Sequence, residues 1–315
     1  MEEFTNSRRG FIKGGLSLAA LMSVPGWAQE PSVKERFETL TILHTNDWHS
    51  RIDPFPINDP KYPGQGGAAR RASLIAKIRK ENDNVLVLDA GDVFQGTPYF
   101  NYYGGEIEFK LMSQMGYDAG TLGNHDFDNG IEGFLKMKPF ANFPFINCNY
   151  DVSNTALNGM LKPFEVFKKS GLKIGVTGVG IDLNGLVPAK NFKNLNYLDP
   201  IEKANENARI LKHDLKCDLV VCLSHLGLEY KNSKTSDMIL AKESMNIDLI
   251  IGGHTHTFLD TPRILQNKIG NEVMIHQVGW AGLRLGKIDY VFSSQNNNTN
   301  KGFSKIKVFK KSIAI

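Results

Sequence analysis

The chain has 315 residues, of which 41% are apolar and 22% are charged, and these proportions are ordinary for a soluble globular protein. They exclude collagen-like, low-complexity and wholly disordered chains. The formal net charge of +4 is too small for this length to indicate binding to polymeric nucleic acid. The three cysteines, Cys148, Cys217 and Cys222, are too few for a disulfide framework, and we expect buried thiols.

The first 28 residues have the features of an export signal. The pair Arg8-Arg9 precedes a weakly apolar run over residues 14–24, and Gly26-Trp27-Ala28 supplies the small residues of a cleavage site. This run is too short to span a membrane, and no later segment approaches the required length. The arginine pair resembles the bacterial twin-arginine signal. We therefore predict a twin-arginine-type signal peptide over residues 1–28 and export of residues 29–315 to the periplasm or beyond.

Predicted strands and helices alternate along most of the remaining chain. Strands are predicted at residues 40–44, 85–88, 118–122, 145–147, 173–179, 219–223 and 247–251. Helices are predicted at residues 68–80, 106–115, 199–215 and 236–243. After His256 only strands follow, at residues 273–278, 285–292 and 304–313. Continuous apolar strands are typical of sheets covered on both faces, so the pattern favours an α/β fold with a β-rich end.

Local signals define the helix at residues 106–115 most clearly. Ile107, Leu111 and Met115 recur at helical spacing and would form its buried face. Acidic residues occupy its first turn and Gly116 follows its last residue, as the helix dipole and C-terminal capping favour.

Five predicted strands run directly into clusters of polar residues that could bind metal ions. The clusters contain Asp47 and His49, Asp92, Asn124 and His125, His225, and His254 and His256. Because the carboxyl ends of parallel strands form the site of an open α/β sheet, we expect these side chains to lie together. Each cluster alone is commoner as a turn, a cap or a buried histidine, but their joint occurrence at strand ends favours a site.

The residue types of these clusters indicate the chemistry. Carboxylate, imidazole and amide ligands suit zinc, manganese, iron or cobalt, and no cysteine occurs among the clusters. One carboxylate can bridge two divalent ions about 3.5–4 Å apart. Such a pair activates a water near neutral pH and neutralises charge on a phosphoryl group during in-line displacement.

Taken together, the clusters resemble the calcineurin-like metallophosphoesterases, whose pattern is D-x-H, G-D, G-N-H-[DE], H and G-H-x-H. The segments that carry the resemblance are residues 44–49, 91–98, 116–130, 224–227 and 248–259. More narrowly, the chain resembles the catalytic domain of bacterial periplasmic 5'-nucleotidases over most of residues 39–292. The resemblance implies a four-layer α/β/β/α sandwich and two divalent metal ions as cofactors.

The resemblance also implies roles for individual residues. One ion would be held by Asp47, His49 and His256, the other by Asn124, His225 and His254, with Asp92 bridging them. Asn124 and His125 would also contact the substrate, and His125 would stabilise the transition state or assist the leaving oxygen. Asp128 would orient His125 and raise its pKa. Asp126 would be structural. Some 5'-nucleotidases lack a histidine at the position of His256, so metal preference can differ.

The remaining histidines and two arginines suggest structural roles. We predict that His44 and His276 pack within the fold and that His213 is solvated on a helix. Arg70 and Arg71 could attract phosphate, but the solvated face of a helix is the favoured interpretation.

The predicted function is that of an exported two-metal phosphoric ester hydrolase, with a 5'-nucleotidase-type phosphomonoesterase favoured. A phosphodiesterase, for example one acting on cyclic nucleotides, is the enzymatic alternative, since one core serves both reactions. The family usually has a second, C-terminal domain that binds the base, whereas residues 29–315 fit a single metallophosphoesterase domain. A catalytic subunit that needs a separately encoded C-terminal-domain protein is therefore the third possibility. In each case we expect a small phosphorylated substrate, with a nucleotide favoured.

Overall fold

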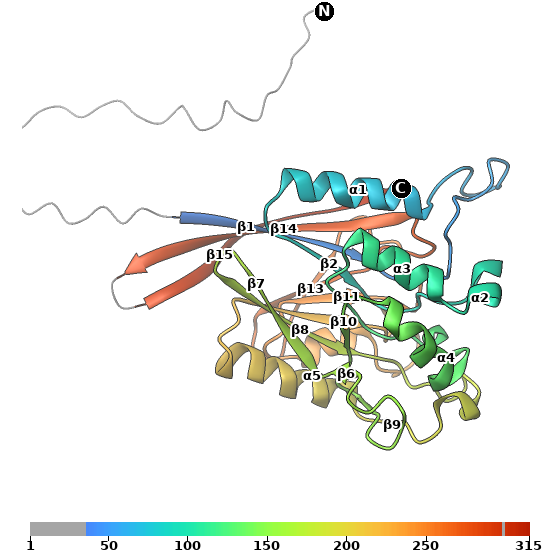
Figure 1. The fold of residues 1–315 in the computed structure, drawn as a ribbon. Coiled ribbons are helices and arrows are strands. Elements are labelled where there is room, and N and C mark those ends of the chain that lie inside the picture. Colours follow the sequence, from blue (N-terminus) through green and yellow to red (C-terminus); the bar gives the residue numbers. More distant parts are fainter. Residues whose placement is uncertain (1–35, 298–299) are drawn as a thin grey trace, which may run out of the picture. The chain divides into compact units, whose positions relative to one another are not determined.

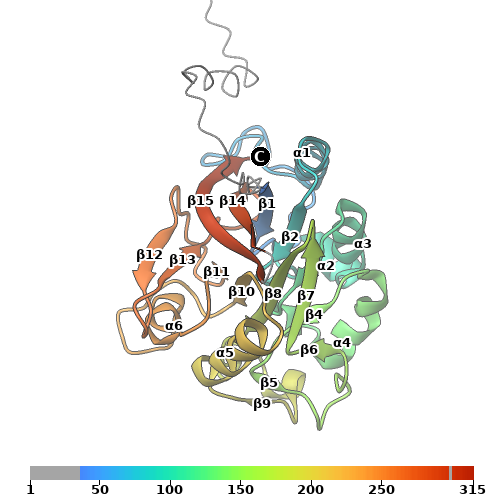
Figure 2. The same cartoon turned by 90° about the vertical axis from the view of Figure 1, so that its left-hand side faces the viewer.

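The computed structural model describes residues 36–297 and 300–315, and its central feature is a pair of β-sheets packed face to face (Figures 1 and 2). The predicted signal peptide at residues 1–28 lies outside the described residues. Within the described ranges, no helix has both the length and the apolar character that crossing a bilayer requires.

The first sheet carries the N-terminal half of the predicted clusters. Its seven strands are β1 (Arg36–Thr45), β2 (Val85–Asp89), β3 (Ala119–Gly120), β4 (Phe145–Ile146), β6 (Leu161–Lys162), β14 (Arg284–Asn297) and β15 (Asn300–Ala314). They lie in the order β15-β14-β1-β2-β3-β4-β6. The strands from β1 to β6 in this order are parallel, whereas β14 runs antiparallel to both β1 and β15.

The second sheet carries the remaining clusters. Its six strands are β7 (Phe164–Lys169), β8 (Leu172–Val179), β10 (Leu219–Ser224), β11 (Leu249–Gly252), β12 (Arg263–Gln266) and β13 (Glu272–His276). They lie in the order β12-β13-β11-β10-β8-β7, with the four inner strands parallel and both edge strands antiparallel. A separate ribbon pairs β5 (Tyr150–Asp151) with β9 (Asn196–Tyr197).

Helices pack on the outer faces of the two sheets. They are α1 (Ala68–Glu81), α2 (Pro98–Tyr103), α3 (Glu106–Met115), α4 (Gly130–Met137), α5 (Pro200–Arg209) and α6 (Asp237–Glu243). Short 3₁₀ turns lie at His125–Phe127, Lys138–Phe140 and Ala189–Phe192, and a π-helical turn lies at Ile210–Asp214. Caps explain several ends: the Asp199 side chain accepts two N–H groups at the start of α5, and Gly116 ends α3 with φ 73°.

Three apolar clusters define the layers between these elements. One lies between the sheets and joins side chains such as Ile42 and Leu88 to Ile174 and Val221. A second joins the first sheet to α1, α3 and α4, and a third joins the second sheet to α5 and α6 (Figure 2). The predicted α/β fold class is therefore confirmed, and the layer order is helices, sheet, sheet, helices.

Two predicted positions are wrong. The helix predicted over residues 199–215 is α-helical only to Arg209 and then passes into a π-helical turn, so that Leu215 at its end is 38% exposed. Arg71 was expected in solvent but is 1% exposed, because this part of α1 packs against Trp48. Cys217 and Cys222 are buried as expected, whereas Cys148 is only half-buried.

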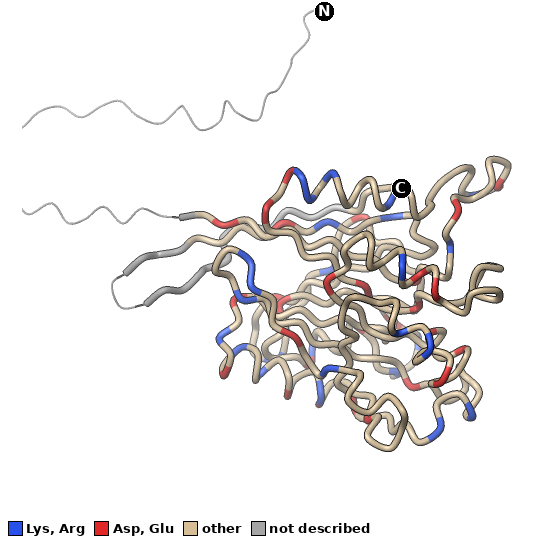
Figure 3. Tube along the Cα trace, viewed as in Figure 1, with Lys and Arg blue, Asp and Glu red and all other residues tan. Residues whose placement is uncertain are grey.

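On α3, Met115 is buried as predicted, but Ile107 and Leu111 are only half-buried, and Phe109 and Met112 are the buried apolar residues beside it. The expectations for three histidines and Arg70 are confirmed. His44 and His276 are both fully buried, with Nε2 of the first 2.8 Å from Nδ1 of the second. His213 is exposed, and Arg70 lies on the exposed face of α1. Lysines and arginines are interspersed with acidic residues along the trace (Figure 3).

Candidate metal centre

The two sheets bring one cluster of side chains together at the carboxyl ends of their parallel strands. The first sheet contributes Asp47 and His49 after β1, Asp92 after β2 and Asn124 after β3. The second sheet contributes His225 after β10 and His254 and His256 after β11. The structure thus places the seven ligands expected from the sequence in two adjoining groups, which we call the first and the second ligand group.

The first ligand group consists of Asp47, His49 and His256. Oδ1 of Asp47 lies 3.9 Å from Nε2 of His49 and 3.3 Å from Nε2 of His256, and the two Nε2 atoms are 2.9 Å apart. Ligand atoms that bind one ion at about 2.0–2.2 Å lie roughly 3–4 Å from one another. The spacing therefore fits a single metal ion.

The second ligand group consists of Asp92, His225 and His254, with Asn124 beside it. Oδ2 of Asp92 lies 3.0 Å from Nε2 of His225, and Nδ1 of His254 lies 2.8 Å from Oδ1 of Asn124. The same Asp92 oxygen is 3.9 Å from Nε2 of His49, which belongs to the first ligand group. The Asp92 carboxylate therefore lies between the two groups, as a bridging ligand would.

Backbone carbonyls fix the orientation of two of the imidazoles. Nδ1–H of His225 donates to the carbonyl oxygen of Ala90 at 2.7 Å, and Nδ1 of His49 is 3.3 Å from that of Phe94. Each Nε2 is thereby left facing the carboxylates. Nε2 of His225 is buried and makes no aligned hydrogen bond within the described chain, although Asp92 is close. A nitrogen aimed at carboxylates in this way fits a divalent cation.

Strained backbone conformations are concentrated at these ligands. Asp47, His49, Asp92, His254 and His256 all have positive φ, between 50° and 70°. This region is unfavourable for residues with a side chain and costs about 1–3 kcal/mol per residue. Such strain persists only where the surrounding structure enforces it, and it is typical of ligand-binding and catalytic sites.

Asp126 holds two of the ligand loops together. Its carboxylate accepts the backbone N–H groups of Asp92 at 3.0 Å, Val93 at 3.0 Å, Phe94 at 3.3 Å and Gly123 at 2.8 Å. Gly123 is required at its position, because a Cβ there would lie 2.1 Å from Oδ1 of Asp92. The contacts of Asp126 are of the structural kind expected from the sequence.

The electrostatics of the centre favour positive charge. Burial alone would lower the pKa of His225, but the carboxylates of Asp92 and Asp47 raise it to about 10. Burial also opposes ionisation of Asp92, yet His225 and His49 hold its pKa below the usual value. For His254, burial and the neighbouring His225 lower the pKa to about 4. The carboxylates thus offer a charge environment that suits cations.

His125 and Asp128 form a pair beside the two ligand groups. Nδ1 of His125 lies 2.9 Å from Oδ2 of Asp128, and this hydrogen bond raises the pKa of the histidine above its ordinary value. The side chain of His125 is 33% exposed, and its ring centre is 5.3 Å from that of His49. It is therefore accessible to a substrate at the first ligand group, while Asn191 holds the loop by donating to the carbonyl of Asp128 at 2.8 Å.

One neighbour of the centre has no signal in the sequence. The indole of Trp280 stacks on His256, with ring centres 5.6 Å apart and planes 6° from parallel. Phe55, Tyr62 and Phe258 surround this tryptophan. Because Trp280 and His256 are far apart in sequence, only the folded chain shows that the ligand rests on an aromatic ring.

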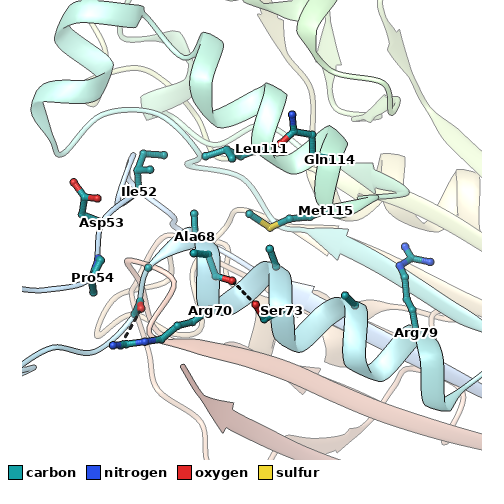
Figure 4. A pocket seen from close by; sticks show the side chains of 15 residues that line it. Ile52, Asp53, Pro54, Ala68, Arg70, Ser73, Arg79, Leu111, Gln114 and Met115 are labelled. Carbon is teal, nitrogen blue, oxygen red and sulfur yellow. Dashed lines mark hydrogen bonds between the residues drawn. The ribbon is translucent and has the colours of Figure 1, made fainter.

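A separate cavity of about 750 Å³ lies between α1 and α3 (Figure 4). Its lining includes Ile52, Leu111 and Met115, with Arg70 and Arg79 nearer its rim. It contains none of the predicted site residues, so its volume is not part of the metal centre.

Comparisons with known proteins agree with this geometry. The family model described as calcineurin-like phosphoesterase matches residues 40–258. The 5'-nucleotidase of Vibrio vulnificus is 33% identical to this chain, and the match covers 90% of this chain and 55% of the relative. The snake venom 5'-nucleotidase of Crotalus adamanteus is 32% identical, and the match covers 82% of this chain and 46% of the relative. The chain thus spans about half the length of these curated relatives.

A solved structure shows the same relationship. The crystal structure of a 5'-nucleotidase precursor from Thermus thermophilus superposes with a TM-score of 0.76 at 29% identity, covering 88% of this chain and 54% of that one. The family match covers the strands and loops that carry all seven expected ligands. The chain therefore belongs to the calcineurin-like phosphoesterase family, which makes it a metal-dependent phosphoester hydrolase by class.

Proposed function

We propose that the protein is a two-metal phosphomonoesterase of the 5'-nucleotidase type. The observation that carries this proposal is the pair of ligand groups around Asp92, with His125 and Asp128 beside them. A single binding site for one ion would not need a carboxylate between two sets of imidazoles. Relatives named 5'-nucleotidases support the choice of reaction.

The two ligand groups account for where the cofactors would be held. The first ligand group would hold one divalent ion, and the second, together with Asn124, would hold the other, with Asp92 shared. When bound, such a pair supplies Lewis acidity and lowers the pKa of a coordinated water. The ligand set of carboxylate, imidazole and amide suits zinc, manganese, iron or cobalt.

Among the side chains of the protein itself, the imidazole of His125 is the group that would act on the substrate. With Nδ1 bound to Asp128, its Nε2 is the atom free to face a phosphate. Protonated at that atom, His125 stabilises negative charge on the phosphoryl oxygens and gives a proton to the leaving oxygen. Asp128 orients the ring and favours its charged form. The amide of Asn124 is close enough along the chain to contact the same phosphate.

A pocket beside the first ligand group supports an aromatic leaving group. It has a volume of about 390 Å³ and is lined by Arg51, Tyr99, Tyr102 and Tyr103. Thr97 of this lining donates its hydroxyl to the carbonyl oxygen of Ser50 at 2.7 Å, and Ser50 directly follows His49, so the pocket lies near the first ligand group. Its size and its aromatic rings suit a nucleobase or nucleoside. We therefore favour a nucleoside monophosphate over a sugar phosphate.

A phosphate-release screen tests the proposal. The chain loaded in turn with Mn²⁺, Zn²⁺ or Co²⁺ should release phosphate from AMP faster than from ribose 5-phosphate. With bis(p-nitrophenyl) phosphate, a diester whose cleavage is followed by release of p-nitrophenol, the same chain should show little activity. Faster cleavage of the diester would favour the phosphodiesterase. No turnover of any ester by the metal-loaded chain, with turnover on adding a separate C-terminal-domain protein, would favour the subunit alternative.

We propose in addition that the protein is exported and that residues 29–315 act as one domain after removal of residues 1–28. The paired arginines and the small residues at 26 and 28 support this proposal. Mass spectrometry of the protein recovered from the periplasm should find an N-terminus near residue 29. Recovery of the full-length chain in the cytoplasm alone would contradict export.

A further inference from the structure

Trp48 is a buried side chain between two ligands of the first group. It is 1% exposed, and its Nε1–H donates to the carbonyl oxygen of Arg51 at 2.6 Å. The hydrogen bond closes the turn that carries Asp47 and His49. Both of these residues, and Ser50 after them, have φ between 50° and 52°. The turn is therefore strained on both sides of Trp48 and needs support from elsewhere.

Arg71 supplies the contact on the other side of this indole. Its guanidinium carbon lies 3.9 Å from the centre of the Trp48 ring, and its side chain is 1% exposed. None of its three guanidinium nitrogens has a hydrogen-bond partner in the described part of the chain. Gly282 closes the site, since a Cβ there would lie 3.0 Å from Nη1 of Arg71. The guanidinium is thus held between the indole and the backbone.

A buried polar network lies near this guanidinium, behind the strand ends that carry the ligands. The carboxylate of Asp89 accepts the hydroxyl of Thr45 at 2.6 Å and the N–H of Gly91 at 2.9 Å. Oγ1 of Thr45 is also 2.8 Å from the hydroxyl of Tyr117. Burial raises the pKa of Asp89 to about 7, and the charge of Arg71 acts in the opposite direction. Arg71 therefore contributes a compensating charge.

Packing alone does not explain an arginine at this position. A buried guanidinium without hydrogen bonds is unfavourable, and a methionine or leucine would fill the space without that penalty. A planar cation over an indole is attractive, more so where water is excluded, and lysine does not reproduce the planar contact. The position thus combines two properties that arginine alone provides.

We propose that Arg71 is a positioning residue for the first ligand group, which acts by holding the indole of Trp48 and hence the turn that places Asp47 and His49. No contact of Arg71 with the ligands is among those of the described residues, so its main action on the first ligand group is through the tryptophan. In the part of the chain that the structure describes, Arg71 reaches the second ligand group only indirectly, through its charge on Asp89, so that group should depend on it less. This inference rests on the proposed metal-holding role of Asp47 and His49.

Two substitutions separate the contribution of the positive charge of Arg71 from that of its planar guanidinium group. Arg71→Met keeps the volume and removes both, whereas Arg71→Lys keeps the charge and removes the plane. Arg70→Met is the matched control, because Arg70 is the next residue on α1, is exposed and bonds only to the carbonyls of Gly64 and Gly66 (Figure 4). Each variant is titrated with Zn²⁺ by calorimetry, and its thermal unfolding is recorded without metal.

The titrations are made in two backgrounds that isolate the groups. His225→Ala leaves the first ligand group as the intact one, and His49→Ala leaves the second. In the His225→Ala background, Arg71→Met should weaken Zn²⁺ binding by about 10- to 100-fold, the range for a residue that orients a ligand, and Arg71→Lys by less. In the His49→Ala background both Arg71 substitutions should weaken binding by a clearly smaller factor. The control Arg70→Met should change binding in neither background.

Two results would overturn the inference. The first is that Arg71→Met and Arg71→Lys, each combined with His225→Ala, bind Zn²⁺ as tightly as the His225→Ala variant alone. The other is equal weakening in both backgrounds, which a general loss of structure would produce. If Arg71→Met does not fold, Arg71→Lys decides by the same criteria. A wild-type chain that binds no Zn²⁺ would instead refute the proposed metal centre itself.

Discussion

The two ligand groups of the candidate metal centre use the same residue types but are held in different ways. In the second ligand group, His225 is fully buried and donates to Ala90, and the backbone N–H of Asp92 donates to Asp126. In the first, the side chain of His256 is 39% exposed and rests on Trp280 through a stacked contact. Each group has two buried ligands and one partly exposed ligand, and both groups contain residues with positive φ. The difference therefore lies in single histidines: His225 is fully buried and hydrogen-bonded, whereas His256 is partly exposed and stacked on an indole.

This difference has a consequence for metal exchange. A fully buried, hydrogen-bonded histidine such as His225 needs local unfolding to leave its ion, whereas the partly exposed His256 on its stacked ring can turn without it. We therefore expect the ion in the first ligand group to exchange faster and to be removed first. The ion that exchanges more easily would then be the one next to His125, the side chain proposed to contact the substrate.

The largest expected effect concerns the residue shared by both groups. Asp92→Asn removes the charge that lies between the two sets of imidazoles, so turnover should fall by about 10³-fold and one metal equivalent should be lost. Phosphate release and elemental analysis measure both quantities. Asp260→Asn, at a side chain that is 84% exposed, serves as the control. Near wild-type turnover of the Asp92 variant would contradict the bridging role.

The next effect separates the fully buried His225 from the partly exposed His256. In metal-free protein His225→Ala leaves Asp92 without its buried partner, so unfolding should be easier by about 3–5 kcal/mol. His256→Ala removes a half-exposed ring, so the loss should stay near 1 kcal/mol. Urea unfolding of both variants measures this difference. Equal destabilisation would show that the two groups are supported alike.

A smaller effect is expected at the residue that acts on the substrate. His125→Ala should retain both metal equivalents and lower kcat by about 10²- to 10³-fold, because a positioned proton donor is lost. Asp128→Asn should lower kcat less, since the ring remains in place. Kinetics with AMP, together with metal analysis, test both variants. Unchanged kinetics would remove His125 from the mechanism, and loss of metal would make it a ligand.

An effect on the pH dependence of folding is expected from a buried acid behind the second ligand group. Asp237 accepts the hydroxyl of Ser224 at 2.5 Å, and burial raises its pKa from 3.8 to about 8. The unfolded chain ionises first, so this residue lowers folding stability as pH rises from about 4 to about 8. Asp237→Asn should flatten this part of the pH dependence in metal-free protein. An unchanged slope between pH 5 and 8 would contradict the assignment.

Much of the fold and the placement of the ligands could be predicted because both follow local rules. The helix Glu106–Met115 was located by its spacing and caps, and the strand-end rule brought Asp92 and His225 together across two sheets. The edge strands β7 and β12 and the helices α2 and α4 were not predicted. Their burial patterns are mixed or their segments are short, so periodicity alone does not define them.

The features that sequence could not supply are contacts between distant segments. Nothing around Arg71 distinguishes it from the exposed Arg70, yet packing against Trp48 buries one and not the other. The stack of Trp280 on His256 and the positive φ angles of the ligands likewise arise only when loops from both sheets meet. Motifs thus indicated which residues to expect at the site, and the tertiary structure shows how those side chains are held.

The most direct test of the central claim is the metal content of the intact chain during stepwise removal by a chelator. The account predicts two equivalents of Zn²⁺ or Mn²⁺ that leave in two phases. The first phase should be absent in His256→Ala, and the second should be absent in His225→Ala. A single equivalent in the wild-type chain, or two equivalents lost in one phase that both variants alter equally, would contradict a centre built from two distinct ligand groups.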